Sequence, residues 1–260
     1  MRDIRVHLDP ALTGRALACG QRVELPAAAA QHLTRVLRLR DGATLTVFDG
    51  RGGEYAATLQ LGLRGAAQVD VGEHRAIERE SRVRIMLLQG LARGERMDWI
   101  IQKATELGVA AIMPIASQRS VVQLESERGD RRLQHWRAIA LAACEQCGRN
   151  TPPTLEAARS LAEALACVAA EPLRLLLEPT AEQTLQDALS APSGGPAGEV
   201  DEPRRVVLLV GPEGGWDPLE LALAHAAGCR AVRLGPRVLR TETAGLAALV
   251  AVQCLAGDFT

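Results

Sequence analysis

The chain has 260 residues, enough to bury a sizeable core in one large domain or in two modest ones. Its formal net charge is −1 at pH 7, so the overall charge gives no sign of a nucleic-acid partner. No apolar run approaches the roughly 20 residues that span a bilayer, and nothing resembles a signal peptide. We therefore expect a soluble, cytoplasmic protein that does not enter a membrane.

The basic residues are distributed unevenly. Residues 81–150 carry 11 basic and 7 acidic side chains, whereas residues 151–260 carry 8 and 14. A regional surplus of this kind fits a face that meets phosphate, and an ordinary charged helix face explains it nearly as well. Six cysteines are scattered, and only Cys144 and Cys147 have a C-x-x-C spacing, without a second pair or a histidine cluster. We therefore expect no metal site.

Residues 1–75 are typical of a small β-barrel that contains one helix. The expected strands are 22–25, 44–48, 54–61 and 68–72, with a helix over 27–38 and a turn at 49–53. The helix places His32, Arg35 and Arg38 within one or two turns, either as a solvated face or as an RNA contact. A polar stretch follows, and we place the domain boundary after residue 75.

Residues 76–260 alternate between apolar runs and helical patterns, which predicts an α/β domain with a doubly wound parallel sheet. The expected strands are 82–88, 111–115, 173–177, 206–210 and 231–234, and the last helix runs from about 241 to 255. Residues 191–203 are rich in proline, glycine and acidic residues, so we expect a flexible surface insert without a catalytic part.

A glycine-rich loop follows the apolar run that ends at Val210. It reads Gly211-Pro212-Glu213-Gly214-Gly215, and its two last glycines suit a sharp turn or a close approach to a ligand. We expect an unusual φ angle at Gly214. Asp217 and Pro218 then predict a helix start, as N-cap and first helical residue.

The same pattern of strand, glycine-containing loop and helix start occurs again further along the chain. The strand that ends at Leu234 is followed by Gly235-Pro236-Arg237, and we expect Thr241 to cap the last helix. Two adjacent strand ends thus expose backbone amides, which is where open α/β sheets bind ligands.

These two stretches together resemble the RsmE-like family of 16S rRNA uracil-N3 methyltransferases, in the SPOUT superfamily. The family pattern contains Gly-Pro-Glu-Gly-Gly and a later Leu-Gly-x-Arg-x-Leu-Arg-x-Glu-Thr-Ala, and residues 211–215 and 234–244 match it without a gap. Residues 32–38 look like the His-x-x-x-Val-Leu-Arg signature of the family's PUA-like RNA-binding barrel. The resemblance implies such a barrel over residues 1–75 and a SPOUT methyltransferase domain with a trefoil knot over residues 76–260, although periodicity does not reveal a knot.

The resemblance implies S-adenosylmethionine as the cofactor, bound across three strand ends. Backbone amides there suit the adenine edges and the methionine carboxylate, and apolar side chains suit the adenine faces. The absence of a Gly-x-Gly-x-x-Gly pattern argues against a dinucleotide enzyme. The residues expected at the cofactor are Leu177, Glu178, Gly211, Pro212, Glu213, Gly214, Gly215, Leu234, Gly235, Arg237, Val238, Leu239, Thr241 and Ala244.

Methylation at N3 of uracil requires the loss of an imide proton that titrates above neutral pH, and a deficit of about two pKa units costs about 3 kcal/mol. A guanidinium stabilises the developing anion, for which Arg119, Arg237 and Arg240 are candidates. Glu213 and Glu242 either accept the proton or tether loop amides or an arginine, and we favour tethering. The predicted catalytic residues are Arg119, Arg240 and Glu213.

The implied partner is 16S rRNA within the 30S subunit or a late precursor, contacted by His32, Arg35 and Arg38. The resemblance also implies a homodimer, for which the alanine- and leucine-rich last helix offers an apolar face. A non-catalytic RNA-binding protein of the same fold is the alternative, and a nucleotide-dependent metabolic enzyme is a third.

Overall fold

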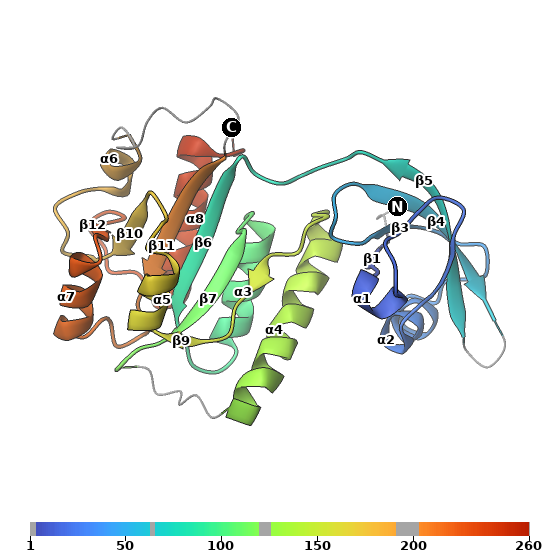
Figure 1. Cartoon of the computed structure of the whole chain (residues 1–260), viewed down its shortest axis with the longest axis horizontal. Helices are drawn as coiled ribbons and strands as arrows, with labels where there is room; N and C mark the ends of the chain where they lie inside the picture. Colours follow the sequence, from blue (N-terminus) through green and yellow to red (C-terminus); the bar gives the residue numbers. More distant parts are fainter. Residues whose placement is uncertain (1–3, 63–65, 120–125, 191–202, 260) are drawn as a thin grey trace. The chain divides into compact units, whose positions relative to one another are not determined.

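A computed structural model of the chain describes residues 4–62, 66–119, 126–190 and 203–259. The chain divides into two compact units, traced in Figure 1. The first comprises Met1–Glu80 and Cys144–Pro152, and the second comprises Ser81–Ala143 and Pro153–Thr260. The division after residue 75 inferred from sequence leaves the returning segment Cys144–Pro152 out of the first unit. Of the expected insert over residues 191–203, all but the last residue lies outside the described residues.

The first unit contains a curled five-stranded sheet in the order β1-β3-β4-β5-β2 (Figure 1). Its strands are β1 (Arg5–His7), β2 (Arg22–Glu24), β3 (Thr44–Phe48), β4 (Glu54–Leu61) and β5 (Ala67–Arg75), and its short α-helices are α1 (Pro10–Thr13) and α2 (Ala27–Gln31). β1 pairs with β3 in parallel, and the other pairs are antiparallel. Alternate residues in the central parts of β3, β4 and β5 enter one apolar core, as period-two alternation predicts.

The prediction of a single helix over residues 27–38 is wrong for the second half of that range. α2 ends at Gln31, and a π-helix, η1 (His32–Val36), follows it. The wider turn places Leu33 in the core, where its carbonyl accepts from the Leu39 amide at 3.0 Å. The chain then leaves the helix through Arg38, at a φ of +53°. His32, Arg35 and Arg38 all remain exposed.

Two arginines that pair with Glu54 also hold the returning segment within the first unit by hydrogen bonds. Arg5 contacts Glu54 at 2.6 Å and also donates to the side chain of Asn150. Arg79 contacts the same carboxylate at 3.1 Å and donates to the Gly148 carbonyl at 2.9 Å. The side chains of Arg5 and Glu54 are only 5% and 3% exposed, so the pair is costly to break.

The second unit contains a parallel sheet in the order β12-β10-β11-β6-β7-β8, with β9 paired to β7. Its strands are β6 (Val83–Gly90), β7 (Ala111–Ala116), β8 (Thr154–Leu155), β9 (Arg159–Ser160), β10 (Arg174–Leu177), β11 (Arg204–Val210) and β12 (Arg230–Val232). Its helices are α3 (Arg96–Glu106), α4 (Ser126–Cys147), α5 (Leu161–Cys167), α6 (Leu185–Ser190), α7 (Pro218–Ala226) and α8 (Thr241–Ala256). The α/β class predicted from alternation is confirmed, and the trefoil knot stays a prediction.

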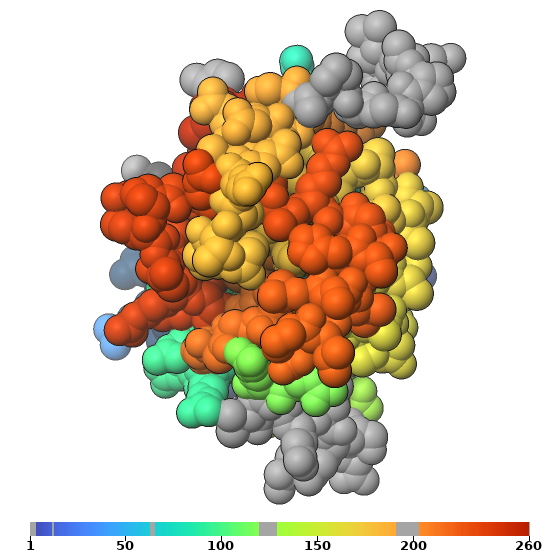
Figure 2. All heavy atoms as spheres, turned by 90° about the vertical axis from the view of Figure 1, so that its left-hand side faces the viewer, coloured from blue at the N-terminus to red at the C-terminus, as the bar shows by residue number. Residues whose placement is uncertain are grey.

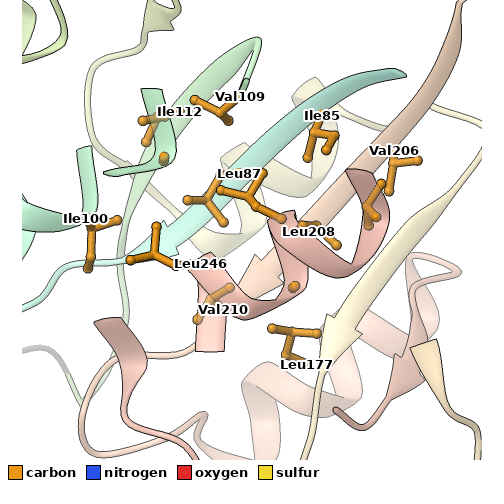
Figure 3. Packing of buried hydrophobic residues seen from close by; sticks show 14 of the residues in the cluster. Ile85, Leu87, Ile100, Val109, Ile112, Leu177, Val206, Leu208, Val210 and Leu246 are labelled. Atoms are coloured by element: carbon orange, nitrogen blue, oxygen red, sulfur yellow. The ribbon is translucent and has the colours of Figure 1, made fainter. Parts of the chain in front are cut away.

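Both faces of this sheet are covered, which explains why its strands are continuous apolar runs. α3, α6 and α8 pack on one face, where Leu87, Leu208 and Leu246 belong to one buried cluster (Figure 3). α5 and α7 contribute to the cluster on the other face, which includes Leu88 and Leu209. No helix in the described part of the chain is long and apolar enough to cross a membrane.

The ion pair of Glu54 makes the stability of the first unit depend on pH. Burial raises the pKa of Glu54, but hydrogen bonds from Arg5 and Arg79 outweigh it and hold that pKa below its ordinary value of 4.5. The stabilisation is therefore complete above pH 4.5 and is lost as pH falls through the lowered pKa.

We expect Glu54→Gln to reduce the free energy of unfolding by about 3 kcal/mol at neutral pH, because it leaves Arg5 buried without its charge partner. Denaturant unfolding at several pH values should show this difference shrinking below about pH 4. Asp70→Asn is the matched control, since the Asp70–Arg22 pair is exposed and should matter much less. A difference for Glu54→Gln that stays constant with pH would contradict this account.

Candidate active site

A cavity of about 700 Å³ lies at the carboxyl ends of β10, β11 and β12, beside the first turn of α8. Its volume falls in the usual range of small-molecule sites. All fourteen residues that the sequence places at a cofactor line this cavity. Figure 2 faces this side of the second unit, where the gold, orange and red-orange segments after β10, β11 and β12 lie together. Three loops that are distant in sequence therefore share one cavity.

The wall also contains residues that the sequence did not single out. They are Arg96, Pro179, Val210, Trp216, Leu221, Val232 and Arg233. Most are strand-end or loop neighbours of expected residues. Arg96 comes from the start of α3, and only tertiary structure brings it here.

The loop after β11 turns sharply at its glycine pair. The Gly215 amide donates to the Pro212 carbonyl at 2.9 Å, and Gly215 has a φ of +68°. The prediction of an unusual φ at Gly214 is therefore wrong, because the turn places the positive φ at Gly215. Gly214 is constrained by packing instead, since a Cβ there would lie 3.1 Å from the Cβ of Arg119.

The start of α7 is as predicted. Asp217 is its N-cap and accepts from the Leu219 amide at 3.0 Å, and Pro218 is its first residue. A reciprocal hydrogen bond from the Asp217 amide to Glu220 completes a capping box. The glycine loop is thus fixed at its far end by a helix start.

The expected capping role of Thr241 is wrong. Arg240 is the N-cap of α8 and makes no side-chain cap, whereas Thr241 is already the first helical residue. The Thr241 hydroxyl donates to the Gly211 carbonyl at 2.5 Å. This side chain therefore links the first turn of α8 to the glycine loop instead of capping its own helix.

Several cavity residues offer unused hydrogen-bond donors. Within the described residues, the amides of Gly214, Gly235, Val238 and Leu239 donate to no protein acceptor. Apolar surface lies beside them, including Leu234 and the side chain of Val238, which is 81% exposed. Free amides next to apolar side chains suit a flat, polar-edged ligand.

Glu213 is held as a tether. Its carboxylate accepts from the Arg93 amide at 2.9 Å and from the Arg96 guanidinium at 2.8 Å. Burial raises its pKa, but these hydrogen bonds and the charge of Arg96 outweigh burial and lower the pKa below its ordinary value. An ionised, engaged carboxylate is a weak proton acceptor at neutral pH. Glu242 lies 3.7 Å from the same guanidinium, so Arg96 bridges the glycine loop and the first turn of α8.

The three candidate arginines differ in their surroundings. Arg119 is not part of the cavity wall, because its guanidinium donates to the Gly214 carbonyl at 3.2 Å and lies 3.6 Å from Asp217. Arg237 and Arg240 line the cavity, and neither side chain has a hydrogen bond or ion pair with the described residues. The structure therefore leaves Arg237 and Arg240 available to a ligand and ties Arg119 to the loop.

The other candidate chemistries find no support among the described residues. No group of three or more histidine, cysteine, aspartate or glutamate side chains there is placed to hold a metal ion. All six cysteines are free thiols. Burial raises the pKa of Cys144 to about 12, so this thiol is not ionised at neutral pH.

Comparison with protein families gives two matches. A family described as the RNA methyltransferase domain matches residues 79–253, and one described as the RNA methyltransferase PUA domain matches residues 25–69. Among curated proteins, the chain is 32% identical over 239 residues to ribosomal RNA small subunit methyltransferase E of Bacillus subtilis. That match covers 87% of this chain and 89% of the relative.

Two solved structures match over 100% of both chains. One is ribosomal RNA small subunit methyltransferase E from Neisseria gonorrhoeae bound to S-adenosyl methionine, with a TM-score of 0.83 and 37% identity. The other is a Legionella pneumophila protein in complex with the bound cofactor SAM, with a TM-score of 0.89 and 36% identity.

The two glycines of the loop after β11 give a test of its geometry. We expect Gly215→Ala to lower the free energy of unfolding by about 1 kcal/mol, because alanine is strained at a positive φ. Gly214→Ala should cost less, since Arg119 needs to move by only a few tenths of an ångström. Chemical denaturation of both variants measures the difference, and the reverse order would contradict the described loop conformation.

Proposed function

This chain belongs to the RNA methyltransferase family, with the family's PUA domain ahead of its methyltransferase domain, and we propose that it transfers a methyl group from S-adenosylmethionine to N3 of a uridine in 16S rRNA. The observation that carries the proposal is the single cavity that gathers the loops after β10, β11 and β12. Relatives that share at least 36% of their residues with this chain over its full length hold S-adenosylmethionine.

The residues of the cavity fit this cofactor. Four unpaired amides and the carboxylate of Glu178 suit the polar edges of adenine, ribose and methionine, and Leu234, Val238 and Leu239 suit the adenine faces. When bound, S-adenosylmethionine supplies an activated methyl group on a sulfonium. The protein's part is to hold the nucleophile in line with that methyl group and to exclude water.

The uridine must lose its N3 proton for the reaction to occur. We assign Arg240 the stabilisation of the resulting anion, because it lines the cavity and has no partner among the described residues. Its guanidinium stays protonated and aims several donors. Arg237 is placed similarly, whereas Glu213 keeps the glycine loop and Arg96 in position. The proton itself then leaves to solvent or to the RNA.

The first unit supplies the contact with RNA in this proposal. His32, Arg35 and Arg38 are exposed on η1 and the residue that leaves it, so their side chains are free to reach phosphates. Few phosphate contacts of this kind give weak, salt-sensitive binding to naked RNA. An assembled 30S particle, or a late precursor, presents RNA whose shape is already fixed and loses less ordering entropy.

A homodimer completes the proposal. The side chains of Trp99 on α3 and Val250 on α8 are 48% and 36% exposed, and both line a shallow apolar hollow with Leu246. A second copy that packs on this face would bury apolar surface symmetrically. α8 contributes to both sites, because its first turn lines the cavity and its later residues Leu246 and Val250 line the hollow.

Transfer of labelled methyl groups to purified ribosomal particles tests the proposed function. We expect 30S particles that lack the modification to be methylated at uridine N3 far faster than protein-free 16S rRNA, because only the particle has preformed RNA shape. Equal rates on both substrates would refute the preference. Cofactor binding without any transfer would identify a non-catalytic RNA-binding protein instead.

Substitution of Arg240 and Glu213 separates their roles. We expect Arg240→Ala to lower kcat by about 100-fold with nearly unchanged cofactor affinity, as for other lost anion-stabilising donors. Glu213→Gln should retain most of the activity, because glutamine still accepts from the Arg93 amide and Arg96. A Glu213→Gln enzyme that is as inactive as Arg240→Ala would show that the carboxylate is the base.

The RNA contact is tested by the double variant Arg35→Ala, Arg38→Ala. It should raise the Michaelis constant for 30S particles severalfold and reduce its salt dependence, while cofactor affinity stays the same. Arg15→Ala, Arg75→Ala removes two exposed charges from the same unit and serves as the control. Identical particle kinetics in the two double variants would show that Arg35 and Arg38 belong to an ordinary solvated face that does not contact RNA.

Sedimentation velocity tests the dimer at micromolar concentration. We expect the wild type to be dimeric and Val250→Arg to be monomeric, because a charge on the apolar face opposes packing. Leu219→Arg, at an 80% exposed position on α7, should remain dimeric. A wild-type chain that is monomeric and active would rule the dimer out.

A further inference from the structure

Gln89 is a buried polar residue that the proposed chemistry does not use. It lies near the end of β6, its side chain has no exposed surface, and it does not line the cavity. Its amide nitrogen donates to the Gly90 carbonyl at 3.1 Å and to the Thr241 hydroxyl at 2.8 Å. The Thr241 hydroxyl in turn donates to the Gly211 carbonyl at 2.5 Å. These bonds form a relay from β6 through α8 to the glycine loop.

The direction of this relay is fixed by its ends. The Gly90 carbonyl only accepts, so the amide nitrogen of Gln89 must face it, and not the amide oxygen. The Thr241 hydroxyl then accepts from that nitrogen, and its own proton is directed to the Gly211 carbonyl. Pro212 has no N–H, so this carbonyl is the sole hydrogen-bonding group of the Gly211–Pro212 peptide. The relay therefore fixes the first peptide of the glycine loop.

The relay has a cost in folding free energy that a purely apolar core would avoid. The Oε1 atom of Gln89 is buried and has no hydrogen-bond partner. A leucine of similar volume would remove this penalty. Two glycines also make room for the arrangement: a Cβ at Gly245 would lie 3.1 Å from Oε1, and one at Gly90 would overlap Pro212. The chain thus maintains a polar group in an apolar core next to the cavity.

We propose that Gln89 is a positioning residue that, through Thr241, holds the loop after β11 against the start of α8, where the loop after β12 ends, and so presets the cofactor cavity. The inference rests on the proposed function, because it assigns the relay to S-adenosylmethionine binding. A preset cavity loses less conformational entropy when it binds its ligand. Breaking the relay at Gln89 frees the glycine loop and the start of α8 to move independently, which weakens cofactor binding although Gln89 itself does not line the cavity.

The test measures the dissociation constant for S-adenosylmethionine by titration calorimetry on the full chain. Gln89→Met and Thr241→Val each break the relay, and each should weaken binding about tenfold, which corresponds to 1.4 kcal/mol. The double variant should be no weaker than either single variant, because both remove one shared interaction. Thr241→Ser retains the hydroxyl and should bind nearly as the wild type does.

Thr105→Val is the matched control for loss of a buried polar group. Thr105 is fully buried in α3 and donates to the Ile101 carbonyl at 2.8 Å, away from the cavity. It should lower the thermal midpoint but not the cofactor affinity. If Gln89→Met does not fold, Gln89→Leu replaces it, because Thr241 lines the cavity and its variants alone do not separate the relay from a direct contact.

Two outcomes separate this inference from the proposed function. Wild-type affinity in Thr241→Val, or losses that add in the double variant, would overturn the relay while the proposed function stands. Absence of S-adenosylmethionine binding by the wild type would contradict the proposed function and the relay with it.

Discussion

The parallel pairing of β11 between β6 and β10 is the constraint on which the candidate site depends. Parallel strands end at the same edge of a sheet, so the loops after β10, β11 and β12 must meet there. The apolar side chains that cover both faces of the sheet hold this register. The cavity is therefore a consequence of core packing, and its chemistry comes from what the loops carry.

Hydrogen bonding then decides which loop groups are free to act. Glu213, Arg96 and Arg119 are engaged with neighbouring loops, so they fix geometry and are poorly placed for proton or anion chemistry. Arg237 and Arg240 are left without partners among the described residues, and so are several backbone amides. A site in which some groups are tied and others are unpaired is preorganised for a ligand that satisfies the unpaired ones.

The sequence predicted the parts of the site that depend on local pattern. Apolar runs closed by glycine located the strand ends, and these ends, the loops after them and the first turn of α8 supplied every residue expected at the cavity wall. It placed the unusual φ at Gly214 and not at Gly215, because adjacent glycines are alike in sequence. The direction of the Thr241 hydroxyl and the position of Arg96 depend on contacts across the sheet, which local pattern does not contain. The π-helix that begins at His32 likewise depends on a tertiary contact, the burial of Leu33 in the core.

Mass spectrometry of 16S rRNA from cells that lack this protein tests the central claim most directly. We predict that one N3-methyluridine disappears from the RNA and returns when the wild-type gene is restored, but not when the Arg240→Ala variant is supplied. An unchanged set of methylated uridines in the deletion strain would contradict the account.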